Sequence, residues 1–315
     1  MRLVMYSTPW GQPSPGVETR DGAVVPVRAV LGGDAPATVA RLLAWLPAVG
    51  EQLRAAVAAA ESDPEQAAAQ GRLLAAGTTR LHAPLGERVL IVGTGGNYRS
   101  HLAEMGEQPP ESPAWFVQNP NSVIGPGEPI RLPAAYPDQV DFEGEICVVF
   151  GRSCHGIAAE DVYSCIAGFT ILNDVSARDA MPLVATATTP TQGRWAWTDN
   201  LLRKQFPTFA PLGPAVVTAD EIPDPADIRL TTTVNGVVMQ DASTADLSTA
   251  IPTVVARLSR YFSFEPGDVL STGTPAGVGA ARQPPVFLRP GDSVSVEVEG
   301  IGTLTNPVVG PAAAP

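Results

Sequence analysis

Residues 140–150 follow the hydrophobic and polar pattern of a buried β-strand. The run is rich in β-branched and apolar residues, and a glycine that favours a turn follows it. Because successive side chains of a strand point to opposite faces, Asp141, Glu143 and Glu145 should share one face, and most of the apolar residues should share the other. A second apolar run, at 163–172, predicts a neighbouring buried strand.

The remaining pattern predicts an amino-terminal part with several helices and a carboxyl-terminal part rich in strands. Residues 182–200, rich in threonine and small residues, are interpreted as a loop that either walls a pocket or lies on the surface. The other predicted elements are strands at 3–7, 23–30 and 88–92, helices at 34–46, 51–60 and 62–77, a hairpin that turns at Asn235-Gly236, and a helix whose first turn holds Pro252.

The acidic face of the strand at 140–150 is crowded. Like charges at this spacing repel, and an unpaired buried carboxylate costs enough free energy that it shifts its pKa or finds a cation. Asp174 follows the second strand and could complete a three-carboxylate site with Glu143 and Glu145, whose oxygen ligands favour Mg²⁺, Mn²⁺ or Ca²⁺ over zinc. Two simpler interpretations stay open: acids that are merely solvated, and an Asn-Asp pair that caps a helix.

His101 and Glu104 are candidates for a general base and the carboxylate that orients it. They are three residues apart, so a short helix would place them on one face, within reach of each other. A histidine held in this way is suited to activate water. A solvated helix pair is the alternative, and the glycine-rich stretch at 93–96 could be the hinge of a lid.

Composition narrows the class of partner. The chain has 315 residues and a formal net charge of -12, which disfavours nucleic acid and anionic membranes as partners and favours small-molecule chemistry. No apolar run approaches the length of a membrane span and the first residues lack a signal-peptide pattern, so we expect a cytoplasmic protein. Cys147, Cys154 and Cys165 have no metal-type spacing and are predicted to be free thiols.

Four ordered motifs resemble those of the fumarylacetoacetate hydrolase family, and the resemblance covers roughly residues 88–308. The motifs are Glu-Gly-Glu at 143–145, Asn-Asp-Val-Ser-Ala-Arg-Asp at 173–179, Thr-Gly-Thr-Pro-Ala-Gly-Val-Gly at 272–279 and Gly-Ile-Gly at 300–302. The resemblance implies a mixed α/β, mainly β fold, with a small amino-terminal domain at 1–85 and a catalytic domain built on a rolled β-sheet at 86–315. It also implies a homodimer.

The resemblance further implies a role for each candidate residue. Glu143, Glu145 and Asp174 would hold Mg²⁺, or Mn²⁺ or Ca²⁺. His101 would be the base, Glu104 its orienting partner, and Lys204 a positive charge near the oxyanion. The implied substrate contacts are Tyr98, Arg178 and Thr274.

The leading hypothesis is a metal-dependent hydrolase that cleaves a carbon-carbon bond in an acylpyruvate-type β-diketo acid. An alternative keeps the site but decarboxylates, isomerises or dehydrates a related 2-oxo acid, and a further one is a non-catalytic, metal-stabilised binding protein. The sequence departs from the family pattern at Gln118, where many relatives carry lysine, and at Met181, where many hydrolases carry glutamine. The glycine and aspartate of the Gly-Lys-Ser-Phe-Asp-Thr-type motif are Arg203 and Pro207 here.

Overall fold

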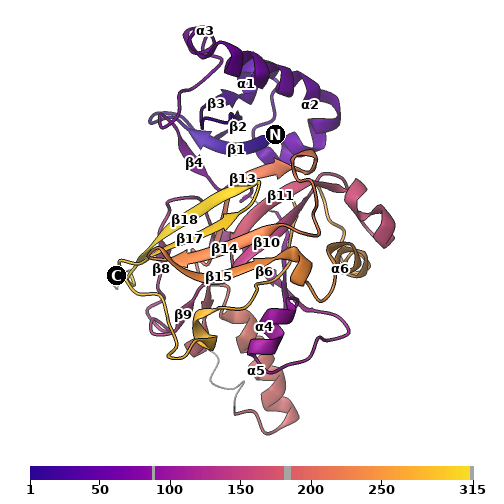
Figure 1. Cartoon of the computed structure of the whole chain (residues 1–315), viewed down its shortest axis with the longest axis vertical. Helices are drawn as coiled ribbons and strands as arrows, with labels where there is room; N and C mark the ends of the chain where they lie inside the picture. The colour runs from indigo at the N-terminus through magenta and orange to yellow at the C-terminus, as the bar shows by residue number, and fades with distance from the viewer. Residues whose placement is uncertain (87–88, 181–185, 313–315) are drawn as a thin grey trace.

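The computed structural model describes residues 1–86, 89–180 and 186–312. The fold is mixed α/β and mainly sheet, as predicted, and contains an eleven-stranded sheet, a five-stranded sheet and a two-stranded ribbon. In Figure 1 the amino-terminal segment, in indigo, forms one end of the molecule, while helices α4 (Arg99–Glu104) and α5 (Pro190–Leu202) lie at the other end.

The large sheet runs in the order β3-β2-β1-β13-β11-β10-β16-β5-β6, with β4 paired to β1 and β7 paired to β13. Its strands are β1 (Arg2–Ser7), β2 (Ser14–Glu18), β3 (Val24–Pro26), β4 (Arg80–His82), β5 (Ile91–Gly95), β6 (Ala114–Gln118), β7 (Val123–Ile124), β10 (Gly144–Phe150), β11 (Ile166–Asn173), β13 (Ala210–Thr218) and β16 (Val269–Ser271). The ribbon pairs β9 (Val140–Asp141) with β12 (Ser176–Ala177). The five-stranded sheet contains β15 (Val237–Ser243), β14 (Arg229–Val234), β17 (Ser293–Val298), β18 (Gly302–Val309) and β8 (Ile130–Arg131).

The amino-terminal strands continue the large sheet and do not form one of their own. β1 pairs antiparallel with β13, with Arg2 opposite Val217 and Leu3 opposite Val216. The four strands from before residue 85 therefore belong to the same sheet as β13, and β1 is the strand that joins them to it. The division into domains at 85 stays a prediction.

The run at 140–150 forms two strands, β9 and β10, where one was expected. β9 is not part of the large sheet. It pairs with β12, and in that ribbon Asp141 is opposite Ser176. Alternation within β10 is as predicted: Ile146 and Val148 pack into one apolar cluster, while Cys147 packs into another on the opposite face. The central strand is buried along its whole length because both faces are covered.

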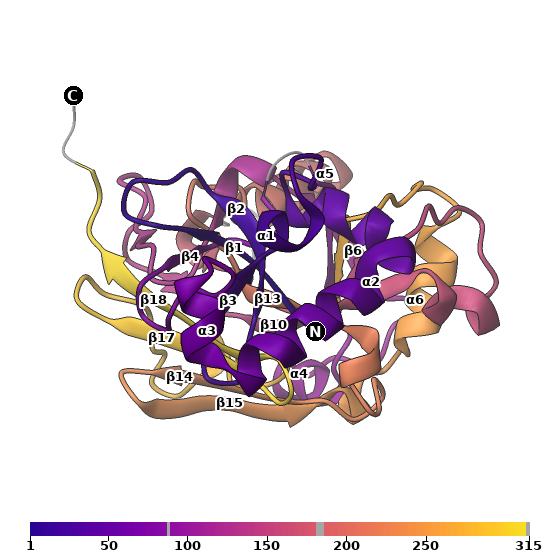
Figure 2. The same ribbon diagram turned by 90° about the horizontal axis from the view of Figure 1, so that it is seen from above.

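The helix α2 (Val39–Ser62) packs on one face of the large sheet, and the second sheet packs on the other face together with α6 (Ile251–Leu258). α2 buries Leu42, Leu43 and Leu53 in a cluster that also contains Val149 of β10. The opposite cluster joins the other face of β10 to β14, β17 and α6. Seen from above in Figure 2, α1 (Val27–Leu31), α2 and α3 (Pro64–Ala69) lie in front of the strands.

Three expectations about helices need correction. The helices expected at 34–46 and 51–60 are one 24-residue helix, α2, which continues through Pro47 because its apolar face packs on the sheet. The helix expected at 62–77 ends at Ala69. The segment interpreted as a loop at 182–200, of which 182–185 lie outside the described residues, includes all but the last two residues of α5, whose polar sequence lacks the periodicity that would have predicted a helix.

Other expectations are confirmed. Asn235 and Gly236 both have positive φ, 51° and 78°, and they join β14 to β15 as the predicted hairpin turn. α6 carries its proline in the first turn, and all three cysteines are free. Within the described part of the chain, none of the helices has both the length and the apolar character needed to cross a membrane.

Candidate active site

The predicted carboxylates Glu143, Glu145 and Asp174 come together where β10 and β11 meet. Glu143 precedes β10, Glu145 is its second residue, and Asp174 follows β11. The strands are antiparallel with Gly144 opposite Asn173, so the start of one lies beside the end of the other. Two hydrogen bonds fix this junction: Asp174 N donates to Glu143 O at 2.8 Å, and Glu143 N donates to Asn173 Oδ1 at 3.0 Å.

Gly144 lets the second sheet approach this junction closely. A Cβ atom at this position would lie 2.1 Å from Thr232 Oγ1 of β14. The Gly144 amide also donates to Gln240 Oε1 at 2.9 Å. A glycine is therefore required between the two glutamates for steric reasons.

The three acids offer a compact set of oxygen atoms. One carboxylate oxygen from each of Glu143, Glu145 and Asp174 lies within 4.8 Å of the others, and all three residues are buried. Lys204 Nζ donates to Glu143 Oε2 at 2.7 Å and also to Asp174 Oδ2, and Ser271 Oγ donates to Glu145 Oε2. Among the described residues, Asp174 Oδ1 has no hydrogen-bond partner.

The positive charges around the site do not compensate all three carboxylates equally. Burial alone would raise the pKa of Glu143, but Lys204 and Arg178, with a smaller contribution from Arg203, hold it below its usual range. Burial, together with the charge of Asp174, raises the pKa of Glu145 well above its usual range. Burial also raises the pKa of Asp174 to about 6, despite its contact with Lys204. The cations of the site therefore do not fully stabilise the charged forms of Glu145 and Asp174.

These observations fit a hard divalent cation. Each acid offers a carboxylate oxygen, these oxygens already lie within a few ångströms of one another, and the Oδ1 atom of Asp174 has no partner among the described residues. The chemistry of the donor set favours Mg²⁺ or Mn²⁺ over zinc. Glu143, Glu145 and Asp174 are therefore the residues that could hold such an ion.

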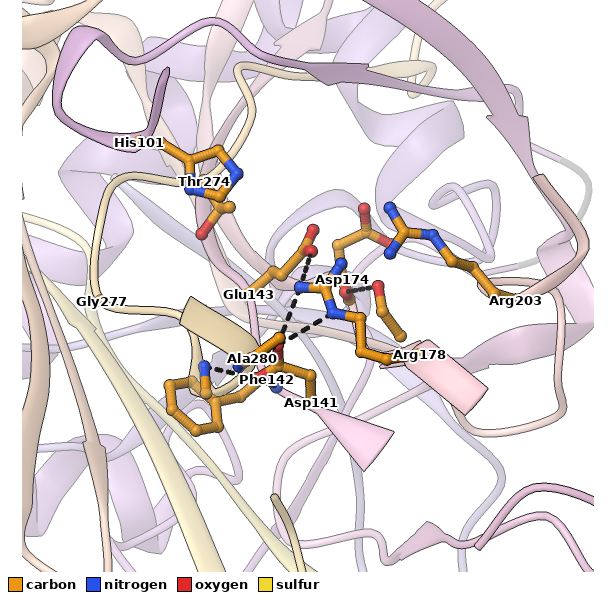
Figure 3. Close-up of polar contacts among 12 residues, drawn as sticks. His101, Asp141, Phe142, Glu143, Asp174, Arg178, Arg203, Thr274, Gly277 and Ala280 are labelled. Atoms are coloured by element: carbon orange, nitrogen blue, oxygen red, sulfur yellow. Dashed lines mark hydrogen bonds and ion pairs between the residues drawn. The ribbon is translucent and has the colours of Figure 1, made fainter. Parts of the chain in front are cut away.

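Asp141 is not part of this carboxylate set, although it was expected on the same strand face. Its Oδ2 accepts from Arg178 Nε at 2.9 Å and from Ala280 N at 3.0 Å, and its Oδ1 accepts from Gly279 N at 2.7 Å (Figure 3). Arg178 Nη2 also donates to Glu143 Oε1 at 2.5 Å. Asp141 thus holds the arginine beside the carboxylates and fastens the 279–281 turn at the same time.

His101 and Glu104 form the predicted pair on α4. His101 Nδ1 lies 2.7 Å from Glu104 Oε1, and Gly277 N donates to Glu104 Oε2 at 2.9 Å. Because its neighbour is a carboxylate, we assign the proton to Nδ1, which leaves the lone pair on Nε2. Gly277 has a φ of 101°, and a Cβ there would lie 2.1 Å from Met239 O, so a glycine is needed where this loop meets the helix.

A cavity of about 920 Å³ lies over the site. Its wall combines the acids with three cations and an apolar side that includes Leu102, Met105, Trp115 and Phe116. Of the residues proposed from the sequence, seven line this cavity: His101, Glu104, Glu143, Glu145, Arg178, Lys204 and Thr274. Asp174 is not among the lining residues, but it bonds to Lys204, which is one of them.

Two of the predicted substrate contacts are placed differently from the rest. Tyr98 lies in the main hydrophobic cluster, with 1% of its surface exposed, and is not among the residues that line the cavity. Thr274 is on the cavity wall, but its Oγ1 donates to Gly144 O at 3.0 Å and accepts from Gln240 Nε2 at 2.8 Å. Thr274 therefore clamps the loop at 272–279 to the Glu-Gly-Glu strand.

Lys204 is buried, although without the family resemblance the sequence would indicate a surface charge. Its ammonium group bonds to two acids and lies 5.1 Å from the centre of the Phe116 ring. Gln118, which stands where many relatives have lysine, donates from Nε2 to Lys204 O at 2.7 Å. It thus holds the backbone that carries Lys204 and is not among the residues that line the cavity.

The other departures from the family pattern are distributed differently. Arg203 lines the cavity, whereas Pro207 is exposed and is not among the lining residues. Met181 lies outside the described residues.

Sequence analysis missed two contributors to the site. Ser271 bonds to Glu145, and Asp141 positions Arg178. Ser271 gave no signal, because it is a small polar residue in a short strand. Asp141 stood out only as a third acid, and its actual partners, Gly279 and Ala280, come from a distant segment.

Comparisons of the sequence and of the fold with known proteins give consistent results. A sequence model described as Fumarylacetoacetate (FAA) hydrolase C-terminal matches residues 90–309. Protein Rv2993c of Mycobacterium tuberculosis (strain ATCC 25618 / H37Rv) is 44% identical over 241 residues, covering 76% of this chain and 82% of that protein. The mitochondrial oxaloacetate tautomerase fahd2 of Xenopus laevis is 34% identical over 315 residues, covering 98% of this chain and 90% of that protein.

Among solved structures, the maleylpyruvate hydrolase from Sphingobium sp. SYK-6 in complex with manganese (II) ion and pyruvate superposes with a TM-score of 0.76. It is 26% identical to this chain, and the match covers 99% of this chain and 100% of that one.

Proposed function

This chain belongs to the fumarylacetoacetate hydrolase family, and we propose that it interconverts the keto and enol forms of a small 2-oxo acid. The observation that carries this proposal is the pairing of two features: a buried set of three carboxylates, two of which line the cavity, and a histidine in the same cavity wall whose Nε2 has no hydrogen-bond partner among the described residues. The oxaloacetate tautomerase named above is similar to this chain over nearly its full length, which supports the same reaction class.

Glu143, Glu145 and Asp174 would hold a divalent ion, Mg²⁺ or Mn²⁺. Such an ion, when bound, supplies Lewis acidity that stabilises negative charge on the oxygen atoms of an enolate. The manganese complex of the maleylpyruvate hydrolase supports the choice of a divalent metal.

The proton transfer is assigned to His101. In the direction from keto to enol, Nε2 takes a proton from the carbon next to the keto group, and the imidazolium then gives the proton to the keto oxygen. One C–H bond breaks and one O–H bond forms, so the substrate gains and loses no atoms. Glu104 holds the Nδ1 proton and stabilises the transient positive charge, and Lys204 and Arg178 add positive potential where the oxygen becomes negative.

Hydrolysis of a carbon-carbon bond in an acylpyruvate is the second candidate. The His101 and Glu104 pair favours it, because a base held by a carboxylate can equally activate water. The similarity to a maleylpyruvate hydrolase bound to pyruvate adds support. Hydrolysis places one more demand on the site: water must enter between Nε2 and a second carbonyl group.

The test is the rate at which enol oxaloacetate becomes the keto form, followed by ultraviolet absorbance. We would compare metal-stripped protein, protein reloaded with Mn²⁺, and Mn²⁺ alone. The reloaded protein should exceed both controls, and His101→Gln should lower kcat about 100-fold or more. The matched control is His155→Gln, because His155 is exposed and bonds only to Phe262 O within the described residues.

Product analysis separates the two candidates. Incubation with a panel of acylpyruvates, followed by NMR, should show no pyruvate if tautomerisation is the only reaction. Metal-dependent release of pyruvate and a free acid would move the assignment to the hydrolase. Binding of several 2-oxo acids with turnover of none would contradict both and favour a binding protein.

A further inference from the structure

The guanidinium group of Arg203 is a cation in the cavity wall that has no carboxylate partner among the described residues. Arg203 lines the cavity and is half-buried. Within the described chain, its side chain makes one hydrogen bond, from Nε to Asn200 O at 3.1 Å. In Figure 3, no dashed line joins Arg203 to any of the carboxylates drawn. At least part of its fork of N–H donors is therefore available to a ligand.

The other two cations of the wall differ in this respect. Arg178 bonds to both Asp141 and Glu143, and Lys204 bonds to both Glu143 and Asp174. Their charges are therefore already paired within the protein. Arg203 is left as the cation that would gain most from an anion arriving from solvent.

A half-buried guanidinium with no carboxylate partner among the described residues is destabilising, because burial disfavours its charge. Burial and the nearby charge of Arg178 lower the pKa of Arg203 to about 10, although the charges of Glu143, Asp174 and Asp141 act in the opposite direction without bonding to it. A planar guanidinium fits a carboxylate through two parallel hydrogen bonds. The carboxylate of a ligand bound in the cavity would thus supply the hydrogen-bond acceptors that the described residues do not offer to this guanidinium.

The position of Arg203 relates this charge to the reacting end of the site. Arg203 directly precedes Lys204, which bonds to two of the three candidate metal ligands. In the view of Figure 3, His101 lies on one side of the labelled carboxylates and Arg203 on the other. Because His101, Glu143 and Arg203 all line the same cavity, a 2-oxo acid whose keto end faces Glu143 and His101 can extend its far end toward Arg203.

We propose that Arg203 recognises a second carboxylate and so selects 2-oxo dicarboxylic acids over monocarboxylic ones. The assignment rests on the proposed 2-oxo acid chemistry and adds a substrate class to it. Arg203 stands where the family motif has glycine, which has no side chain to make such a contact.

The experiment measures dissociation constants by calorimetry with Mn²⁺-loaded protein. Two matched pairs of ligands differ only in the last carbon, a carboxylate in one and a methyl group in the other: oxaloacetate with 2-oxobutyrate, and 2-oxoglutarate with 2-oxovalerate. The proteins are the wild type, Arg203→Met and Arg203→Lys. Arg194→Ala is the control, because it removes an exposed positive charge from α5, the helix that ends directly before Arg203, and the Arg194 side chain bonds only to Thr191 among the described residues.

Arg203→Met should weaken binding of at least one dicarboxylic acid about 10- to 100-fold and change the affinity for its monocarboxylic partner less than about twofold. Arg203→Lys should fall between the wild type and Arg203→Met, because it keeps the charge and loses the fork. Arg194→Ala should match the wild type. Arg203→Lys also serves as the folded substitute if Arg203→Met does not fold.

Two results would overturn the assignment: an equal loss for both members of each pair, and no loss for either dicarboxylic acid. The first would mean that Arg203 acts on the carboxylate common to all 2-oxo acids. If the wild type binds these ligands but does not tautomerise enol oxaloacetate, the proposed reaction fails while the affinity comparison still decides the role of Arg203. If the wild type binds none of them, both proposals are wrong.

Discussion

The Nδ1 atom of His101 lies 2.7 Å from Oε1 of Glu104. This contact fixes the imidazole tautomer, and the second oxygen of the same carboxylate ties the helix to the Gly277 amide. Glu104 thus orients His101 and also anchors α4 to the loop that contains Gly277.

Glu104→Ala should lower kcat about 10- to 100-fold, because His101 loses both its orientation and the charge that stabilises its protonated form. KM should change less than kcat if the loss lies mainly in the proton transfer. Steady-state tautomerisation kinetics would measure both. Glu111→Ala, which removes an exposed acid outside the cavity, is the control and should behave like the wild type. Equal kcat values for the two variants would contradict the role given to Glu104.

Metal affinity should rise with pH. Without metal, the pKa of Asp174 is raised to about 6 and that of Glu145 is raised further above its usual range, so protons occupy ligands that a metal must take as carboxylates. Through Asp174 alone, the dissociation constant for Mn²⁺ should be about tenfold higher at pH 5 than at pH 7. Calorimetry in buffers of different ionisation enthalpy should show proton release on binding. A constant affinity across this range, with no proton released, would contradict the prediction.

Asp141→Ala should destabilise the fold by about 3 to 5 kcal/mol, because it leaves Arg178 without one buried partner and frees the amides of Gly279 and Ala280. The denaturant midpoint in a urea titration would report the loss. Asp241→Ala provides the contrast, since it breaks the exposed ion pair with Arg229 and should leave the midpoint nearly unchanged. If the two variants unfold at the same denaturant concentration, Asp141 does not have the anchoring role described here.

Gly144→Ala should cost about 1 to 3 kcal/mol and weaken Mn²⁺ binding, because the new methyl group would overlap Thr232 and push the strand between Glu143 and Glu145. Thermal unfolding and metal titration would measure the two effects. Gly193→Ala is the matched control, since nothing lies within 4 Å of its added Cβ and the residue is inside a helix. That change should stabilise the protein by about 0.5 to 1 kcal/mol. Unaltered metal binding in Gly144→Ala would contradict the packing argument.

The predictable part of the site is the part encoded locally. Glu143 and Glu145 are two residues apart near one strand, Asp174 directly follows the next strand, and His101 and Glu104 are three apart on one helix. Each of these spacings fixes a shared face or a shared strand end before any tertiary contact is known. The family resemblance then added Lys204 and Arg178, which the local pattern alone would not have placed in a cavity.

The part that could not be predicted depends on distant segments. Gly279 and Asp141 are 138 positions apart, and Ser271 and Glu145 are 126 positions apart. No spacing rule connects residues at such distances, and only the tertiary fold brings them together. The same reason explains the helix errors: packing on the sheet carried α2 through Pro47, and α5 formed without an apolar periodicity.

The pairing of β1 with β13 has a consequence for how the chain is made. Strand β1 leaves the ribosome before β13, because its partners around Val216 and Val217 are more than 200 positions further along the chain. At synthesis rates of 5 to 20 residues per second, β1 waits for roughly 10 to 40 s before that edge exists. During this interval the apolar face of α2 lacks much of the sheet that later covers it. The nascent amino-terminal region therefore keeps apolar surface exposed until β13 emerges.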